Sequence, residues 1–395
     1  MKLKINFLNL GINMELNNLK NTPSRDYHLD FAKGICIILM VIGHSSAPIW
    51  LHEWLSTFHM AVFFMASGFL WKLKNIDDIN SLLKYIWKKI KSLYIPYVLC
   101  NGLFLVLNNF LVIIHIYPET SVLSTYQIMT GLLLILLTGN STILGGATWF
   151  LSVLFLITIL HAIYSFILKN FKYKNIIDFI LVIFCIVMAE VINQLSLGFV
   201  LPLRIGILFS VYVLYRLGMI IKLIYDKLEN ITIGGGYQLI IVIALLGILI
   251  ICSIFIGGVE LNSGKIVNIA YLLFVSICGW GFLWVTASIL HKYMNVICKI
   301  IGYFGRNTLP IVLWHFIAMK FVSYIWISTN NLSILLLASF PVIENTTYWF
   351  WTCYTVGGVF IPILVNIPYK FVKQILYERL KSMLIKSRSS NENSL

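Results

Sequence analysis

The chain has 395 residues, of which 59% are hydrophobic and only 11% charged, with a formal net charge of +14. A soluble globular domain carries about 25% charged residues, so the composition excludes an ordinary soluble protein and predicts an integral membrane protein. The positive excess lies in short loops beside apolar segments, where it orients spans and contacts anionic membrane lipids. We therefore do not expect nucleic-acid binding.

Apolar segments long enough to cross a bilayer, roughly 20 residues each, recur about ten times. This pattern predicts an all-α, polytopic membrane fold. The expected spans are 31–50, 56–72, 93–116, 147–168, 176–193, 200–222, 237–257, 266–288, 308–327 and 349–372. Residues 28–372 then form one membrane domain, preceded by an N-terminal segment (1–27) and followed by a basic, partly disordered tail (373–395).

The connecting loops alternate between rich and poor in Lys and Arg. The loop from Lys72 to Ser92 carries six lysines, whereas the next loop, from Tyr117 to Gly146, carries no Lys or Arg. Because basic loops stay in the cytoplasm, both termini are expected on the cytoplasmic side of the cell membrane, plasma or inner. The first 30 residues lack the pattern of a cleavable signal peptide.

Two further segments do not fit a simple span. Residues 79–92 mix Leu, Ile, Tyr and Trp with lysines, a pattern typical of a helix on the cytoplasmic membrane surface. Residues 127–138 are apolar but too short to cross, which predicts a re-entrant or interfacial helix on the outer side.

The seven cysteines lie in or at the ends of apolar segments, and none belongs to a Cys-x-x-Cys pair. This distribution favours free, buried cysteines over a disulfide framework or a metal site. We therefore expect no bound metal.

The first span carries two basic residues at bilayer depth, where each titratable side chain costs several kcal/mol and needs a reason. Lys33 and His44 are eleven residues apart, which is three helical turns plus about 20°, so both lie on one face about 16 Å apart. Asp30 can pair with Lys33 from the preceding turn. Gly34 and Gly43 would let a neighbouring helix or a ligand approach closely.

Other polar residues map to the same half of the membrane as His44. His59 follows a short connection and is expected near the height of His44, while His315 lies near the middle of the ninth span. Glu190 and Arg204 end the fifth span and begin the sixth. These positions favour a polar pocket that opens outward and has a basic entrance on the cytoplasmic side.

Structural roles for these residues remain open at this point. His59 and His315 could bridge helices through hydrogen bonds, and Glu190 and Arg204 could form an interfacial ion pair. Trp149 could be an interfacial aromatic residue, because Trp is enriched where a span meets the membrane surface.

Four stretches give the chain a resemblance to a known family. They are an Arg/Lys-x10-His motif (Lys33–His44), FHMAVFFMASGF (Phe58–Phe69), a Trp-Phe-Leu signature (Trp149–Leu151) and GRNTLPIVLWH (Gly305–His315). In this order and spacing they resemble the membrane acyltransferase-3 family, which includes bacterial polysaccharide O-acetyltransferases and the fucose 4-O-acetylase-like group.

The resemblance implies acyl-coenzyme A as donor, most often acetyl-CoA, a saccharide or lipid-linked glycan hydroxyl as acceptor, and no permanently bound cofactor. His44 would be the general base or a covalent acyl carrier. His59 would orient His44 or donate to the developing oxyanion. Lys33 and Arg306 would bind the phosphates of the donor. The expected substrate-binding residues are Glu190, Arg204, Trp149 and His315.

The chain also departs from the family pattern. Lys33 stands where Arg is commoner, Val312 replaces a frequent Tyr, and no esterase-like domain is expected after the last span. The acceptor would then be handled by the membrane domain itself or by a partner. Two other readings stay open, namely an exporter or flippase that uses His44 as a proton relay, and a structural partner in a glycan-assembly complex.

Overall fold

Every bounded element in the described part of the chain is helical. The computed structural model describes residues 26–72, 76–195, 205–228, 234–264, 266–344 and 347–368. The α-helices are α2 (Tyr27–Gly43), α3 (Ile49–Ser56), α4 (His59–Phe69), α5 (Ile79–Lys89), α6 (Ile95–Val106), α7 (Asn108–Ile113), α8 (Thr125–Thr138), α9 (Trp149–Leu168), α10 (Lys174–Gln194), α11 (Ile205–Leu228), α12 (Gly235–Phe255), α13 (Ile269–Tyr293), α14 (Asn295–Arg306), α15 (Thr308–Thr329) and a last helix, Phe350–Pro368. Short 3₁₀ turns are Glu119–Ser121, Gly146–Thr148 and Ile334–Ala338.

Seven helices in the described ranges are long and apolar enough to cross a membrane. They are Gly146–Leu168, Lys174–Gln194, Gly206–Lys227, Gly235–Phe255, Ile269–Tyr293, Thr308–Thr329 and Phe350–Pro368. Each corresponds to one of the last seven predicted spans, which confirms an all-α, polytopic membrane protein. The total of about ten spans, the position of both termini and the domain boundaries stay predictions.

The first three predicted spans correspond to shorter or interrupted helices. α2 has 17 residues, so it is about 25 Å long, and it ends at Gly43 before a turn in which Ser46 has a positive φ of 57°. α4 has only 11 residues. The third segment is broken at Leu107, between α6 and α7. The predicted spans were therefore longer than the observed helices, because averaged hydropathy does not detect breaks within an apolar segment.

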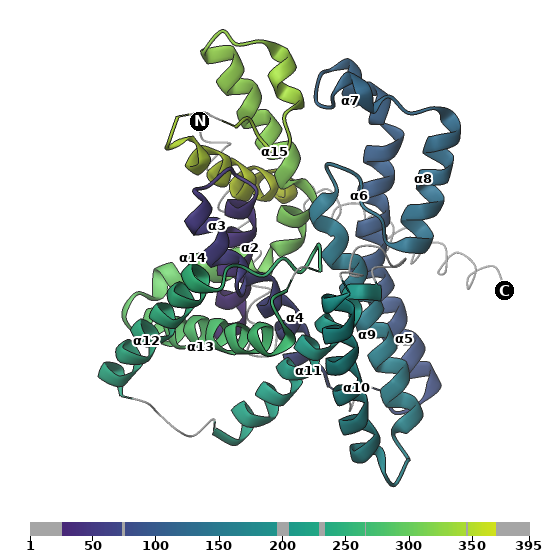
Figure 1. Ribbon diagram of the computed structural model, residues 1–395, viewed down its shortest axis with the longest axis vertical. Coiled ribbons are helices and arrows are strands. Elements are labelled where there is room, and N and C mark those ends of the chain that lie inside the picture. Colours follow the sequence, from purple (N-terminus) through teal and green to yellow (C-terminus); the bar gives the residue numbers. More distant parts are fainter. Residues whose placement is uncertain are drawn as a thin grey trace, which may run out of the picture.

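The two segments that fitted no span are helical, as predicted. α5 covers most of the lysine-rich segment, and it continues through a π-helical turn, Ile90–Tyr94, directly into α6. Its location on the cytoplasmic membrane surface stays a prediction. α8 is apolar, has 14 residues and packs beside α6 (Figure 1).

Close helix crossings at glycines hold the centre of the molecule together. A Cβ atom at Gly34 would lie 2.0 Å from the carbonyl oxygen of Ile301, and one at Gly305 would lie 1.8 Å from that of Asp30. Only glycine permits α2 and α14 to touch through their backbones in this way. Gly68 of α4 meets the backbone of Tyr215 in α11 similarly, at 1.8 Å. In Figure 1, α2 and α4, which make these crossings, lie near the centre, with α3 beside α2.

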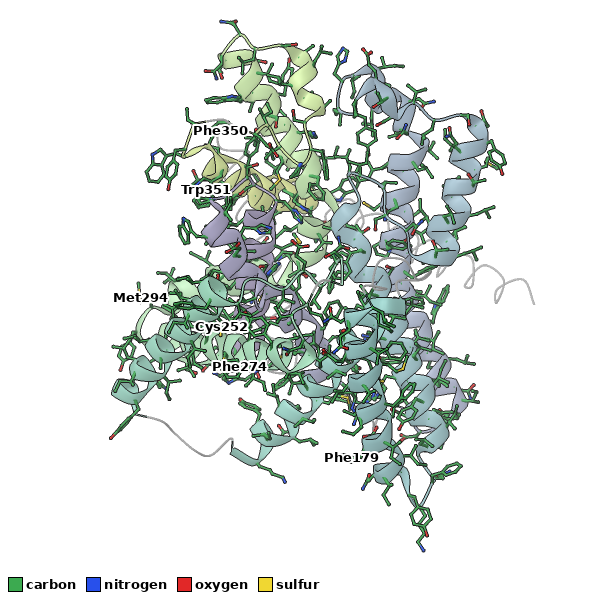
Figure 2. The ribbon with its side chains drawn as sticks, viewed as in Figure 1. Phe179, Cys252, Phe274, Met294, Phe350 and Trp351 are labelled. Carbon is green, nitrogen blue, oxygen red and sulfur yellow. The ribbon has the colours of Figure 1, made fainter. Side chains whose placement is uncertain are left out.

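The outer surface of the helices is rich in carbon, as Figure 2 shows. Large apolar side chains such as Phe179, Phe274 and Met294 are 68%, 48% and 50% exposed. So large an apolar surface is not tolerated in water by a monomeric protein, but it suits contact with lipid. Polar residues that chemistry could use are instead found inside, around α2.

Candidate functional site

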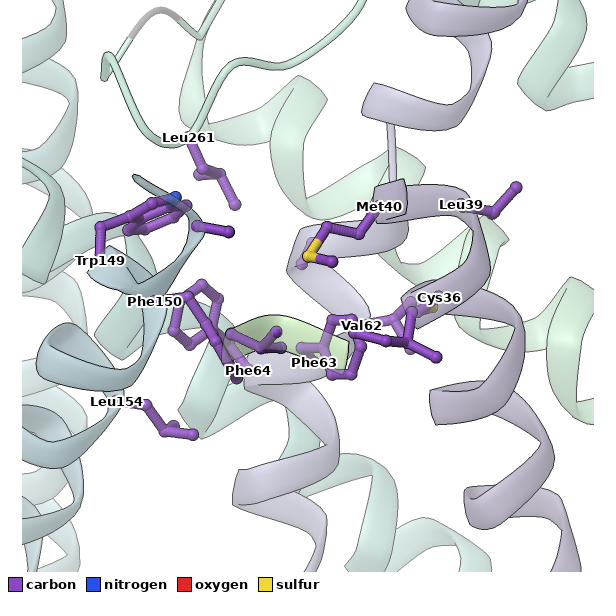
Figure 3. Packing of buried hydrophobic residues seen from close by; sticks show 14 of the residues in the cluster. Cys36, Leu39, Met40, Val62, Phe63, Phe64, Trp149, Phe150, Leu154 and Leu261 are labelled. Carbon is purple, nitrogen blue, oxygen red and sulfur yellow. The ribbon is translucent and has the colours of Figure 1, made fainter. Parts of the chain in front are cut away.

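A cavity of about 210 Å³ lies where α2, α3, α4 and α9 meet the loop before α13. We call it the His44 cavity. Its polar lining residues are His44, His52, Ser56, His59, Trp149, Glu260, Asn262 and Ser263. Met40 of α2, Phe63 of α4 and Phe150 of α9 form part of its apolar wall. Figure 3 shows Trp149 and Phe150 facing Met40 and Phe63, with Leu261 reaching in from the loop.

His44 occupies the end of α2, where its side chain is half-buried. Its ring lies 5.5 Å from the ring of His315 and 4.9 Å from that of Phe316, measured between centroids. Within the described residues its ring nitrogens form no hydrogen bond, and the imidazole lines the cavity. His44 is therefore held by ring packing, with its nitrogens left for a substrate.

His59 begins α4 and lines the same cavity. Its Nδ1 lies 2.6 Å from the carbonyl oxygen of Leu55. A carbonyl only accepts, so Nδ1 carries a proton and donates it. In the neutral ring, Nε2 then has the lone pair, which means that neutral His59 accepts a proton there and cannot donate to an oxyanion.

His315 lies in α15 and is fully buried. Its Nδ1 donates to the carbonyl oxygen of Ile311 at 2.9 Å, one turn earlier, as His59 does to Leu55. Its Nε2 is buried and has no hydrogen-bond partner in the described protein. A buried polar atom without a partner is unusual and marks a place where a substrate or a proton is expected.

The opposite end of α2 carries a cluster of charges. The Asp30 carboxylate lies 3.5 Å from the Lys33 ammonium and 3.6 Å from the Arg306 guanidinium. The close approach of α14 at Gly305 brings Arg306 to this position. An ammonium and a guanidinium group thus lie against one carboxylate, and both are groups that bind phosphate in proteins.

Buried side chains separate this cluster from His44. On the connecting face of α2, Ile37 is 0% exposed and Met40 is 6% exposed. Met40 lines the His44 cavity, but Lys33 does not.

Glu190, which was predicted to bind substrate, does not line the His44 cavity. Glu190 accepts a hydrogen bond from the backbone N–H of Ile269 at 2.9 Å, and so caps the start of α13. Arg204 lies outside the described residues. Lys320, also in α15, is buried and donates to the carbonyl oxygens of Leu337 and Ser339.

Sequence reasoning missed part of the cavity lining. His52 lies on α3, in the connection between two of the motifs, and Glu260, Asn262 and Ser263 lie in the loop after α12. The sequence feature that could have identified His52 is its position between His44 and His59. The loop gave no comparable signal, because nothing in its sequence shows that it folds over α4.

The described residues contain no group of three or more His, Cys, Asp or Glu side chains that could hold a metal ion. All seven cysteines are free, and six of them are buried, as expected from their distribution.

Comparison with known proteins gives one match. A family model described as an acyltransferase domain, that of acyltransferase family 3, matches residues 26–367, which is most of the chain. No curated protein and no solved structure matches this chain.

Proposed function

Because this chain belongs to acyltransferase family 3, we propose that it transfers an acyl group, in the simplest case acetyl, from acyl-coenzyme A to a saccharide hydroxyl. The acceptor is a cell-surface or lipid-linked glycan. We place the enzyme in the plasma or inner membrane, with the His44 cavity open to the side of the glycan.

The observation that carries this proposal is a set of three imidazoles: His44 and His59 line the cavity, and His315 lies against the ring of His44. His44 has unbonded ring nitrogens there, and His59 and His315 each use Nδ1–H on a backbone carbonyl. Both therefore present Nε2 as a proton acceptor when neutral. A hydroxyl is a weak nucleophile that needs a base, and imidazole is suited to that work.

In direct transfer, His44 takes the proton of the acceptor hydroxyl while its oxygen attacks the thioester carbonyl carbon. The carbon–sulfur bond then breaks, and coenzyme A leaves as a thiol after it receives the proton from His44.

In transfer through a carrier, a nitrogen of His44 attacks the thioester carbonyl carbon and the carbon–sulfur bond breaks. Coenzyme A leaves as a thiol with the proton of the other ring nitrogen. The acceptor oxygen then attacks the acyl-imidazole, its proton goes to a second base, and the carbon–nitrogen bond breaks to give the ester and His44, which regains the proton from that base. His59 and His315 are the available bases, because each has a lone pair on Nε2 when neutral. This route suits a donor and an acceptor on opposite sides of a membrane.

Lys33 and Arg306 would bind the donor phosphates. Both cations face the Asp30 carboxylate, at 3.5 Å and 3.6 Å, so they lie together at one place on the molecule. The thiol arm of the donor would run along α2 toward His44, where Ile37 and Met40 now fill the space, so these side chains must move when the donor binds.

NMR of the host's surface glycans tests the proposal, with the gene intact, deleted, and restored as His44→Ala. We expect an O-acyl resonance to disappear on deletion and to stay absent with His44→Ala. A matched control is His291→Gln, because His291 is exposed and only stacks on Tyr27. Unchanged O-acylation with a reduced amount of glycan would favour export instead. Release of coenzyme A by the purified protein separates the two directly.

A further inference from the structure

A second cavity, of about 410 Å³, lies next to the His44 cavity. We call it the Ser141 cavity. Three segments distant in sequence form it: the residues after α7, the residues before α9, and the residues after the 3₁₀ turn Ile334–Ala338. Its rim is accessible, because Ile143 and Phe340 are 41% and 43% exposed.

Only a thin wall separates the two cavities. Gly146 lines the Ser141 cavity, and its neighbour Ala147 lines the His44 cavity. The buried ring of Phe316 completes the wall, 4.9 Å from the ring of His44 on one side and 4.9 Å from that of Phe340 on the other. A ligand in the Ser141 cavity would therefore lie beside the reacting group.

The lining determines which ligand fits. Within the described residues Ser141 has a buried hydroxyl without a hydrogen-bond partner, whereas the Thr142 hydroxyl donates to Asn101 Oδ1 at 3.1 Å. A hydrocarbon chain would leave the Ser141 hydroxyl without a hydrogen bond, which costs about 1–3 kcal/mol. An anion would find no cation among the lining residues. A neutral ligand with hydroxyl groups and apolar faces satisfies the Ser141 hydroxyl and the rings of Tyr117 and Phe340 together.

Lys320 holds one wall of this cavity in place. It is 2% exposed, and its ammonium group donates to the carbonyl oxygens of Leu337 and Ser339 while lying 5.8 Å from the ring centroid of Phe340. A buried cation is retained only where such partners satisfy it. The segment that carries Phe340 is thus fixed to α15, the helix of His315.

We propose that the Ser141 cavity binds the sugar unit next to the one that is acylated. This inference rests on the proposed function and names its substrate class: an acceptor of at least two sugar units rather than a free monosaccharide. Binding of the second unit would raise the reaction rate on longer acceptors, because remote contacts then help to orient the reacting hydroxyl.

Kinetics with the host's own surface glycan, de-O-acylated by mild alkali and cut into size-graded fragments, test this. Coenzyme A release from acetyl-CoA is the readout. We expect Ser141→Ala and Phe340→Leu to raise KM for disaccharides and longer fragments roughly three- to tenfold, with little effect on the monosaccharide. Thr130→Ala is the control, since Thr130 bonds only within exposed α8. Equal effects on all fragments, or none, would overturn the inference while leaving the acyl transfer intact.

Binding without turnover gives an independent test. The double variant His44→Ala, Ser141→Cys is labelled with a membrane-impermeant maleimide in the presence and in the absence of the same fragments. We expect protection that begins at the disaccharide. Glu119→Cys is the control, because Glu119 is exposed on the segment after α7, next to the lining residue Pro118, but does not line the cavity. If none of the fragments stimulates coenzyme A release by the unmodified enzyme, the proposed function fails. Absence of protection overturns the inference itself.

Discussion

The ring of His44 stacks on the ring of His315, with 5.5 Å between their centroids and 28° between their planes. The two residues come from α2 and α15, at opposite ends of the sequence. The stacking fixes the orientation of His44 and places the unpartnered Nε2 of His315 beside the reacting group.

We predict that His315→Phe and His315→Gln both lower kcat about 100-fold or more. Phe keeps the ring packing but removes both nitrogens, and Gln keeps a group that can bond Ile311 but removes the base; loss of a positioned acid or base is worth 10²–10⁴-fold. Coenzyme A release at saturating acetyl-CoA measures this. A rate above half that of the unmodified enzyme in His315→Phe would show that packing alone matters.

Lys33 is predicted to act through its charge. Lys33→Ala should raise KM for acetyl-CoA about 10- to 100-fold with a smaller change in kcat, because a charge-assisted contact contributes about 1.5–3 kcal/mol. Lys33→Arg should keep substantial activity. Lys172→Ala is the control, since Lys172 is exposed on the short connection before α10.

A second donor makes the Lys33 experiment more specific. With acetyl-dephospho-coenzyme A as the donor, the rise in KM caused by Lys33→Ala should be smaller if Lys33 contacts the phosphate that this donor lacks. Activity of Lys33→Arg as low as that of Lys33→Ala would show a role beyond charge.

Much of the candidate site was predictable from the sequence because its parts follow from helix geometry. The spacing of Lys33 and His44 placed them about three turns apart along one helix, and the short connection brought His59 to the cavity. The motif resemblance pointed to Trp149 and His315. The structure places both of them at His44, Trp149 in the cavity lining and His315 against its ring.

Features that depend on contacts between distant elements were not predictable. Glu190 is a titratable residue at the end of an apolar span, as a site residue would be. Only the approach of α10 to Ile269 shows that its carboxylate instead bonds the backbone N–H at the start of α13. The polar loop at Glu260 and the three segments around Ser141 are likewise joined by tertiary packing alone. The first predicted span ran past the end of α2 for a local reason, because the apolar segment was continued across the turn at Ser46.

Gly305→Ala is predicted to disturb the crossing of α2 and α14. The added Cβ would lie 1.8 Å from the carbonyl oxygen of Asp30, so the helices must separate, which costs about 1–3 kcal/mol. We expect a lower thermal unfolding midpoint in detergent and a raised KM for acetyl-CoA, since Arg306 moves with α14. Gly302→Ala is the matched control on the same helix, where the nearest atom would be 3.5 Å away. Equal midpoints for both variants would contradict this account.

Glu260 is predicted to act on the acceptor and not on the donor. It lines the His44 cavity from the loop after α12, far along the chain from Lys33, and its carboxylate accepts a hydrogen bond from Ser263 at 2.9 Å. Glu260→Gln removes the charge but keeps the shape, so KM for the glycan fragments should rise about three- to tenfold while KM for acetyl-CoA stays unchanged. Glu344→Gln, on another exposed loop, should alter neither constant. A parallel rise in both constants would place Glu260 in the stability of the cavity rather than in acceptor recognition.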